Sequence, residues 1–272
     1  MASPYWIKTL INKTFSGRFF FSKLTHNPVI GRMIDHALFD GDDIFYLTKD
    51  RAIPVNKSVD LPESLMIPSL VADHFIREAN YHWIMDFCIC RESSHCRDYP
   101  VDLGCIFLGE AAVDINPKFG RRVTSDEALA HAMRCREAGL VHLIGRNKLD
   151  TVWLGVGPGR KLLTICNCCP CCCLWKILPA ITPEIGCKIS RMPGISVRIT
   201  DKCIGCGICS KNLCFVDAIH IENQRAVINK ESCRGCGRCV EACPSNAIEV
   251  IIENSGFINE SIRRISNLVD VK

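Results

Sequence analysis

Cysteine is the residue type that most constrains how this chain can fold. The 272 residues include 20 cysteines, and six of them lie within the eight residues from Cys166 to Cys173. Disulfide frameworks are typical of small secreted domains, whereas this chain is long and we expect no secretory leader. Adjacent thiols are poor disulfide partners but good metal ligands. We therefore expect bound metal and a reducing, oxygen-poor cytoplasm.

The overall composition excludes several other classes of protein. A hydrophobic fraction of 48% with 23% charged residues indicates a globular chain rather than a disordered one. The net charge of +4 and the absence of a Lys/Arg-rich run argue against nucleic acid as a partner. The uncharged stretch between Lys161 and Lys176 is shorter than the roughly 20 residues that span a bilayer. We expect no transmembrane segment.

Two cysteine motifs form an internal repeat in the C-terminal part. Residues 203–214 read Cys-x2-Cys-x2-Cys-x4-Cys, and residues 233–244 read Cys-x2-Cys-x2-Cys-x3-Cys-Pro. Three thiols at this spacing can share one tight loop, while a fourth ligand must come from elsewhere. Two zinc sites would leave the triple spacing unexplained, because structural zinc prefers separated pairs of ligands.

Residues 196–252 resemble the bacterial-type ferredoxin with two [4Fe–4S] clusters, and residues 233–244 match its motif completely. The first motif departs from the family pattern, because its last gap is one residue longer and Phe215 replaces the usual proline. The resemblance implies crossed ligation of two clusters. One cluster would be held by Cys203, Cys206, Cys209 and Cys243, and the other by Cys233, Cys236, Cys239 and Cys214. Short strands are expected at 195–199, 218–222, 226–229 and 247–251.

Ten of the other twelve cysteines form two groups that fit no motif. The set Cys88, Cys90, Cys96 and Cys105 could hold one more [4Fe–4S] cluster, which we favour over zinc and over buried free thiols. The run consists of Cys166, Cys168, Cys169, Cys171, Cys172 and Cys173. Neighbouring thiols in an extended chain point in opposite directions, so they cannot all bind one cubane. Some of them must bind a second cluster, a larger or non-cubane cluster, or nothing.

A wider resemblance covers roughly residues 85 to 250. The cysteine run, taken with the segment Glu137-Ala138-Gly139-Leu140-Val141-His142, is similar to multi-cluster 4Fe–4S oxidoreductases of anaerobes. That group brings no secure activity with it. Isolated residues are given structural roles: His95, His131 and His142 as hydrogen-bonded histidines, Cys135 and Cys187 as packing residues, and Trp153 and Trp175 as shields of the run.

The predicted fold class is α+β, with a cysteine-rich N-terminal α/β domain followed by a ferredoxin-like (βαβ)2 dicluster domain. The predicted divisions are a basic extension at 1–60, a cluster-binding domain at 61–194, the ferredoxin domain at 195–252 and a C-terminal helix at 253–272. Three prolines and two glycines indicate a linker near residues 179–193.

Several local elements can also be predicted. The first 34 residues hold five basic residues, no acid and apolar side chains at helical spacing. We favour a helix packed on the body or on a partner over weak peripheral membrane contact. The capping box at Thr124 to Glu127 predicts a helix over 125–138. A helix is expected over 69–87, short strands and loops over 35–68, and a hairpin from 152–156 and 161–165.

Three functional classes follow from these features. The first is an electron-transfer subunit that relays single electrons through two [4Fe–4S] clusters to further N-terminal clusters and a redox partner. The alternative is an oxidoreductase in which an unusual cluster at Cys166 to Cys173 reduces a disulfide or a small electrophile. Cluster storage or assembly is the third class, and nothing in the sequence favours it.

Overall fold

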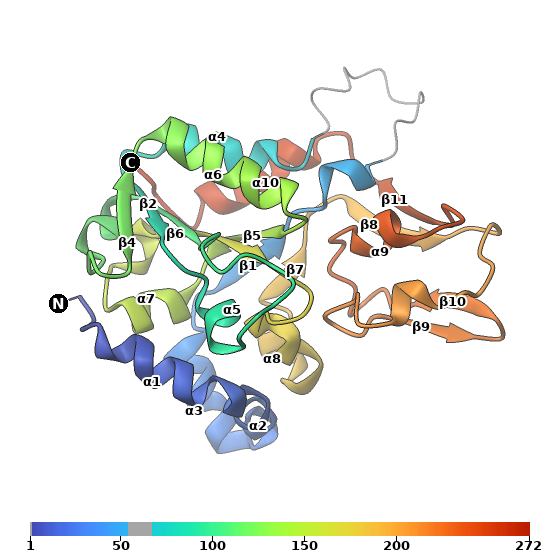
Figure 1. Cartoon of the computed structure of the whole chain (residues 1–272), viewed down its shortest axis with the longest axis horizontal. Coiled ribbons are helices and arrows are strands. Elements are labelled where there is room, and N and C mark those ends of the chain that lie inside the picture. Colours follow the sequence, from blue (N-terminus) through green and yellow to red (C-terminus); the bar gives the residue numbers. More distant parts are fainter. Residues whose placement is uncertain (1, 54–66) are drawn as a thin grey trace.

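A seven-stranded mixed sheet lies at the centre of the computed structural model, which describes residues 2–53 and 67–272 (Figure 1). The strand order is β4-β2-β3-β6-β5-β1-β7. The strands are β1 (Asp43–Tyr46), β2 (His82–Met85), β3 (Ile106–Leu108), β4 (Gly120–Val123), β5 (Val141–Arg146), β6 (Leu163–Cys168) and β7 (Ile189–Arg191). Only β1 and β7 pair in parallel among these described strands.

The α+β class is confirmed, but the α/β character expected for the N-terminal part is wrong. An α/β domain needs successive parallel strands joined by crossover helices. Here β2 pairs with β3 and β5 pairs with β6 in antiparallel fashion, although α7 (Lys148–Leu154) lies between β5 and β6 in the chain. The sheet is therefore mainly antiparallel, and each of its two faces is covered by a different set of helices.

One face of the sheet is covered by α4 (Leu70–Glu78), α6 (Ser125–Glu137) and α10 (Phe257–Ser266), as Figure 1 shows. The alternation of side chains along each strand directs Phe45, Ile144 and Leu163 into this core. The predicted capping box is confirmed, because Thr124 Oγ1 accepts from Glu127 N at 3.3 Å and Glu127 Oε2 accepts from Thr124 N at 2.8 Å.

The opposite face carries the cysteines of β6. Because side chains alternate, Cys166 and Cys168 lie on the face opposite Leu163 and Ile165. The covering elements are α1 (Trp6–Thr14), α2 (Arg18–Lys23), α3 (Pro28–Leu38), α5 (Ile89–Ser93), α7, the 3-10 helix Leu174–Ala180 and α8 (Pro183–Gly186). The sequence thus places its thiols beneath the N-terminal helices.

The N-terminal helices pack on the body of the protein, which confirms the favoured interpretation. Lys8 Nζ lies 2.9 Å from Glu92 Oε1, and Ser93 Oγ donates to Asn12 Oδ1 at 2.7 Å. Their outer surface nevertheless leaves large apolar side chains in solvent. We define this exposed helical surface by Trp6, Leu10, Phe20, Val29 and Met33. None of the helices in residues 2–53 and 67–272 is long and apolar enough to cross a membrane.

Three local predictions were wrong. The helix expected over the whole of 69–87 ends at Glu78, and β2 follows it. The hairpin expected from 152–156 and 161–165 does not form, because α7 occupies its first strand and ends at Gly155 with φ of +65°. The region 179–193 is no plain linker, since its residues 189–191 form β7 and pair with β1.

Of the segment 35–68, residues 54–66 lie outside the described residues, and residues 35–38 belong to α3.

The ferredoxin-type unit (195–252) lies beside one end of the sheet (Figure 1). Its elements are β8 (Ile195–Ile199), a 3-10 turn (Ile208–Ser210), β9 (Ile219–Glu222), β10 (Arg225–Ile228), α9 (Arg238–Ala242) and β11 (Ile248–Ile252). Strand, short helix and strand therefore occur twice, and the four expected strands are present. The strands pair as β8 with β11 and β9 with β10.

Candidate metal centres

Two cavities in the ferredoxin-type unit are each lined by four cysteines. One cavity is lined by the outer quartet, which we define as Cys203, Cys206, Cys209 and Cys243. The other is lined by the inner quartet, which we define as Cys214, Cys233, Cys236 and Cys239. Each cavity combines three thiols of one motif with the last thiol of the other. The two groupings are those implied by the crossed ligation of dicluster ferredoxins.

Backbone N–H groups point at the sulfurs of both quartets. Ala226 N donates to Cys203 Sγ, Ala218 N donates to Cys214 Sγ, and Ala247 N donates to Cys243 Sγ, each at 3.3 Å. Such hydrogen bonds stabilise thiolate over thiol and tune the potential of an iron–sulfur cluster. The donor set of eight sulfurs with amide support therefore fits two [4Fe–4S] clusters.

Glycine lets each loop wrap closely around its cavity. Gly205 has φ of +67°, and a Cβ there would lie 2.1 Å from Gln224 O. Gly237 has φ of +81°, and a Cβ there would lie 2.6 Å from Ala52 Cβ. The second contact joins the ferredoxin-type unit to the seven-stranded sheet with its covering helices, which we call the sheet domain.

The inner quartet lies against the sheet domain, whereas the outer quartet faces solvent. Thr48 Oγ1 donates to Gly235 O at 2.8 Å, and Lys49 N donates to Cys236 O at 3.1 Å. At the outer quartet, Cys206 is exposed and the adjacent Ile204 side chain is 69% exposed. The two candidate sites thus differ in their access to solvent.

Arg238 is buried between the inner quartet and the cysteine run. Its Nη2 donates to Cys168 O, and its guanidinium lies 5.5 Å from the centre of the Phe215 ring. Among residues 2–53 and 67–272 no carboxylate pairs with it. The pKa of Arg238 is raised, because the negative charge of Cys236 and Cys168 outweighs the effect of burial. A buried cation needs an anion, and cysteines held as thiolates by a metal would supply one beside Arg238.

Tyr46 and Phe215 connect the same two regions. Their ring centroids are 4.7 Å apart, and Tyr46 Oη lies 4.0 Å from Cys173 Sγ. Phe215 follows Cys214 directly in the chain. Phe215, which departs from the ferredoxin motif, therefore packs on Tyr46, and Tyr46 in turn lies beside Cys173. Together the two rings connect the inner quartet to the run.

A cavity of about 490 Å³ lies under the N-terminal helices. Seven thiols of the first cysteine set and of the run line it, and we define six of them as the cavity thiols: Cys88, Cys90, Cys105, Cys166, Cys168 and Cys173. Cys105 Sγ and Cys166 Sγ are 3.5 Å apart. Cys169 also borders this cavity.

A second buried arginine lies among these thiols. Arg91 is 0% exposed, and it donates to Asn167 O at 2.7 Å and to Leu103 O. Burial opposes its charge, but Cys88, Cys169 and neighbouring sulfurs raise its pKa overall. The pKa of Cys88 is lowered, first because Cys90 donates a hydrogen bond to it. At Cys88 this favours thiolate, which is the metal-binding form of cysteine. The pKa values of Cys90, Cys166 and Cys168 are raised, first by their hydrogen bonds to neighbouring thiols and then by burial.

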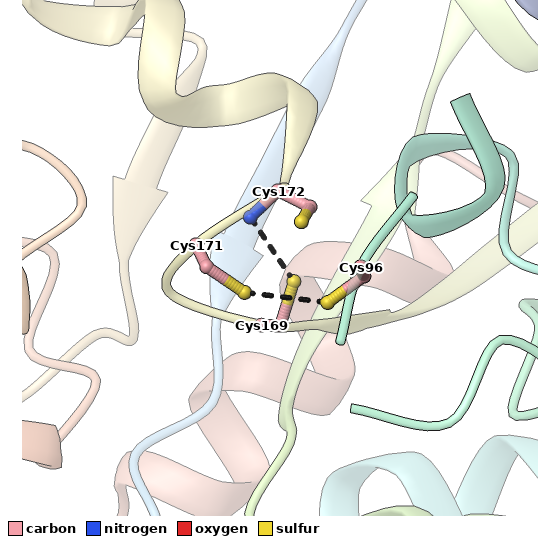
Figure 2. A group of neighbouring side chains, drawn as sticks. All are labelled: Cys96, Cys169, Cys171 and Cys172. Atoms are coloured by element: carbon pink, nitrogen blue, oxygen red, sulfur yellow. Dashed lines mark hydrogen bonds between the residues drawn. The ribbon is translucent and has the colours of Figure 1, made fainter. Parts of the chain in front are cut away.

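Four further cysteines form a separate group, which we define as the Cys96 group: Cys96, Cys169, Cys171 and Cys172 (Figure 2). Their sulfur atoms all lie within 4.8 Å of one another. The set expected from Cys88 to Cys105 is therefore divided, because Cys96 joins the run and its three companions line the cavity. Sequence spacing could not find this grouping, since Cys96 and Cys171 are 75 residues apart.

His131 and His142 hold structural positions. His142 Nδ1 lies 2.8 Å from Asn167 Oδ1, and His131 Nε2 lies 2.9 Å from Gly104 O. Burial, and then the nearby charge of Arg136, lower the pKa of His142 to about 4, so it is neutral at pH 7.

The residues expected to pack or to shield the run differ in how deeply they are buried. Burial raises the pKa of Cys135 to about 12, which suits a packing thiol, whereas Cys187 is exposed and the packing role expected for it is wrong. Trp153 and Trp175 both border the cavity, and Trp175 is 2% exposed.

Comparison with known proteins identifies the ferredoxin-type unit. Residues 226–249 match the 4Fe-4S binding domain family, and this range contains four cysteines of the second motif. Part of the chain is 46% identical over 72 residues to a subunit of the Na(+)-translocating ferredoxin:NAD(+) oxidoreductase complex of Acetobacterium woodii, and the match covers 24% of this chain and 21% of that protein.

A second relative is a subunit of the ion-translocating oxidoreductase complex of Methanosarcina acetivorans, 46% identical over 48 residues, which are 18% of each chain. The chain thus spans about a fifth of the length of these relatives. No solved structure matches it. The C-terminal part of this chain contains a 4Fe–4S binding domain of the ferredoxin type, as the sequence motif predicted.

Proposed function

We propose that the protein relays single electrons between a redox partner and an iron–sulfur centre in its N-terminal domain. An iron–sulfur electron-transfer role is supported by the family match and by the two relatives, which are components of oxidoreductase complexes. When bound, each [4Fe–4S] cluster supplies a site that takes up and releases one electron. The order of sites proposed here is outer quartet, inner quartet and cavity thiols.

The observation that carries this order is the contact between Phe215 and Tyr46. It joins Cys214 of the inner quartet to Cys173 of the cavity thiols without an intervening solvent layer, because Tyr46 is 0% exposed and Phe215 is 3% exposed. Arg238 supplies positive charge along the same boundary. These residues favour electron exchange between the two regions and exclude water from it.

We propose that the partner docks at the outer quartet, where Cys206 and Ile204 are exposed. The relatives are components of multi-subunit complexes, so a protein partner in a reducing cytoplasm is the partner we infer. The cavity thiols would hold at least one further cluster, with Arg91 offsetting its negative charge.

Selective loss of the outer site tests this order. In anaerobic full-length protein, Cys206→Ala should remove the outer cluster, so reduction of the N-terminal centre by a reduced ferredoxin slows strongly. Titanium(III) citrate, a small reductant, should still reduce that centre. Cys187→Ala alters another exposed cysteine and should leave both rates unchanged. Equal rates with reduced ferredoxin in wild type and Cys206→Ala would contradict the proposed order.

A second candidate is an oxidoreductase whose catalytic centre lies at the cavity thiols. The cavity of about 490 Å³ beside them favours it, because it could admit a small substrate such as a disulfide or an electrophile. Catalysis would need an iron with an open position. Cyanide, thiols or substrates should then shift the electron paramagnetic resonance signal of that centre, and unmoved signals would exclude the open position.

A further inference from the structure

We propose that the Cys96 group holds one Zn²⁺ ion, separate from every iron–sulfur cluster. The four sulfurs come from two loops, one after α5 and one after β6, and they converge on a common point in Figure 2. No histidine or carboxylate belongs to the group. A set of four thiolates is a closed tetrahedral donor set, which suits structural zinc.

The spacing of the sulfurs distinguishes one ion from a cluster. With Zn–S bonds of about 2.3 Å, tetrahedral geometry places the four sulfurs about 3.8 Å apart. A cubane separates its four thiolates further, because each thiolate binds a different iron atom. The observed limit is 4.8 Å for the whole group, and Cys96 Sγ and Cys171 Sγ are 3.5 Å apart. The pocket among these sulfurs therefore fits a single ion.

The surroundings of the group are those of a closed structural site. Cys172 N donates to Cys169 Sγ at 3.3 Å, which is a hydrogen bond that favours thiolate. Cys169 and Cys172 are buried and pack against Leu103 and Leu140. With all four positions taken by protein sulfur, no position is left for water or substrate.

The ion would give the cysteines of the run two different roles, zinc binding and lining of the cavity. Cys168 and Cys173 flank the three zinc-binding thiols of the run, and both face the cavity. Tying the loop between them to Cys96 fixes the positions of these two cavity thiols. Binding releases the thiol protons to solvent and changes no oxidation state. The run can therefore carry six thiols without directing all of them to one cluster.

Metal and sulfide analysis of one variant tests the proposal. In anaerobically purified full-length protein, Cys171→Ser should lose one zinc per chain and keep its iron and acid-labile sulfide. Cys135→Ala is the matched control, since Cys135 packs in the same cluster without belonging to the Cys96 group. It should keep the zinc. Loss of about four irons with their sulfide from Cys171→Ser would overturn the proposal and assign these thiols to a cluster.

Wild-type protein provides a second measurement that does not depend on folding of the variant. Zinc X-ray absorption should show four sulfur neighbours at about 2.3 Å and no metal neighbour. Wild-type protein without zinc, or zinc bound by nitrogen or oxygen, would overturn the proposal. Both measurements report on zinc, whereas the electron relay depends on iron. The zinc proposal and the proposed function can therefore fail independently.

Discussion

Arg238 donates a hydrogen bond from Nη2 to the backbone carbonyl of Cys168. This contact joins the first residue of α9 in the ferredoxin-type unit to the last residue of β6 in the sheet domain. Both residues are buried, and the inner quartet lies on one side of the arginine while the cavity thiols lie on the other. The cation thus occupies the boundary that electrons would cross.

Replacing Arg238 should lower a reduction potential. Reduction adds negative charge, so loss of the nearby cation in Arg238→Met should make reduction harder, by ~60 mV for each 1.4 kcal/mol of lost attraction. Arg238→Lys should retain part of the effect. Potentiometric titration followed by electron paramagnetic resonance measures the shift. Arg198→Met removes an exposed arginine of the same unit and should shift the potential far less. An unchanged potential in Arg238→Met would show that the arginine does not stabilise added charge.

Cys236→Ala should remove one cluster of the ferredoxin-type unit. Because Cys236 belongs to the inner quartet, we expect a loss of about four irons and an interrupted relay. The sheet domain should stay folded, since most of its core comes from its own strands and from α4, α6 and α10, although Ile195 and Val250 of the ferredoxin-type unit also belong to that core. Iron analysis with circular dichroism checks both points. Global unfolding would contradict the division into two domains.

Asp42→Asn should change the pH dependence of stability. Asp42 Oδ1 accepts from Lys148 N at 2.6 Å, and burial raises the pKa of its carboxyl to about 7. The unfolded chain ionises this group near pH 4, so native stability falls as pH rises from about 4 to about 7. The amide stays neutral, so the variant should lose that fall and gain at most about 4 kcal/mol at pH 8.

Thermal unfolding at pH 5 and pH 8 measures this difference. Asp40→Asn is the control, because Asp40 is an exposed carboxylate two residues away. Its unfolding temperatures should follow those of wild type at both pH values. The same fall in stability for Asp42→Asn and wild type would show that Asp42 ionises normally in the folded protein.

The exposed helical surface allows the alternative of weak peripheral membrane contact to be measured. Its apolar side chains lie among basic residues of the same helices, so binding to anionic vesicles should exceed binding to neutral ones and weaken with salt. Phe20→Ser with Met33→Ser should reduce sedimentation with vesicles several-fold. Val113→Ser changes an exposed apolar residue elsewhere and serves as control. Equal sedimentation of all variants would exclude this contact.

Local chemistry was predictable from the sequence, and long-range grouping was not. The capping box at Thr124 and the triple thiol spacing are local patterns, so they predicted α6 and the ferredoxin motif. The pairing of β7 with β1 joins residues far apart in the chain and leaves no local signal. The same holds for Cys96, whose partners were found only in the folded chain. Phe215 was visible as a departure from the motif, but its contact with Tyr46 was not.

Iron and acid-labile sulfide content, measured together on oxygen-free full-length protein, tests the central claim most directly. The two quartets predict about eight irons per chain, and the cavity thiols predict about four or more in addition, with matching sulfide. About twelve or more irons per chain would agree with the relay. Colourless, iron-free protein would contradict the whole account, and a reproducible value near eight would contradict a cluster at the cavity thiols.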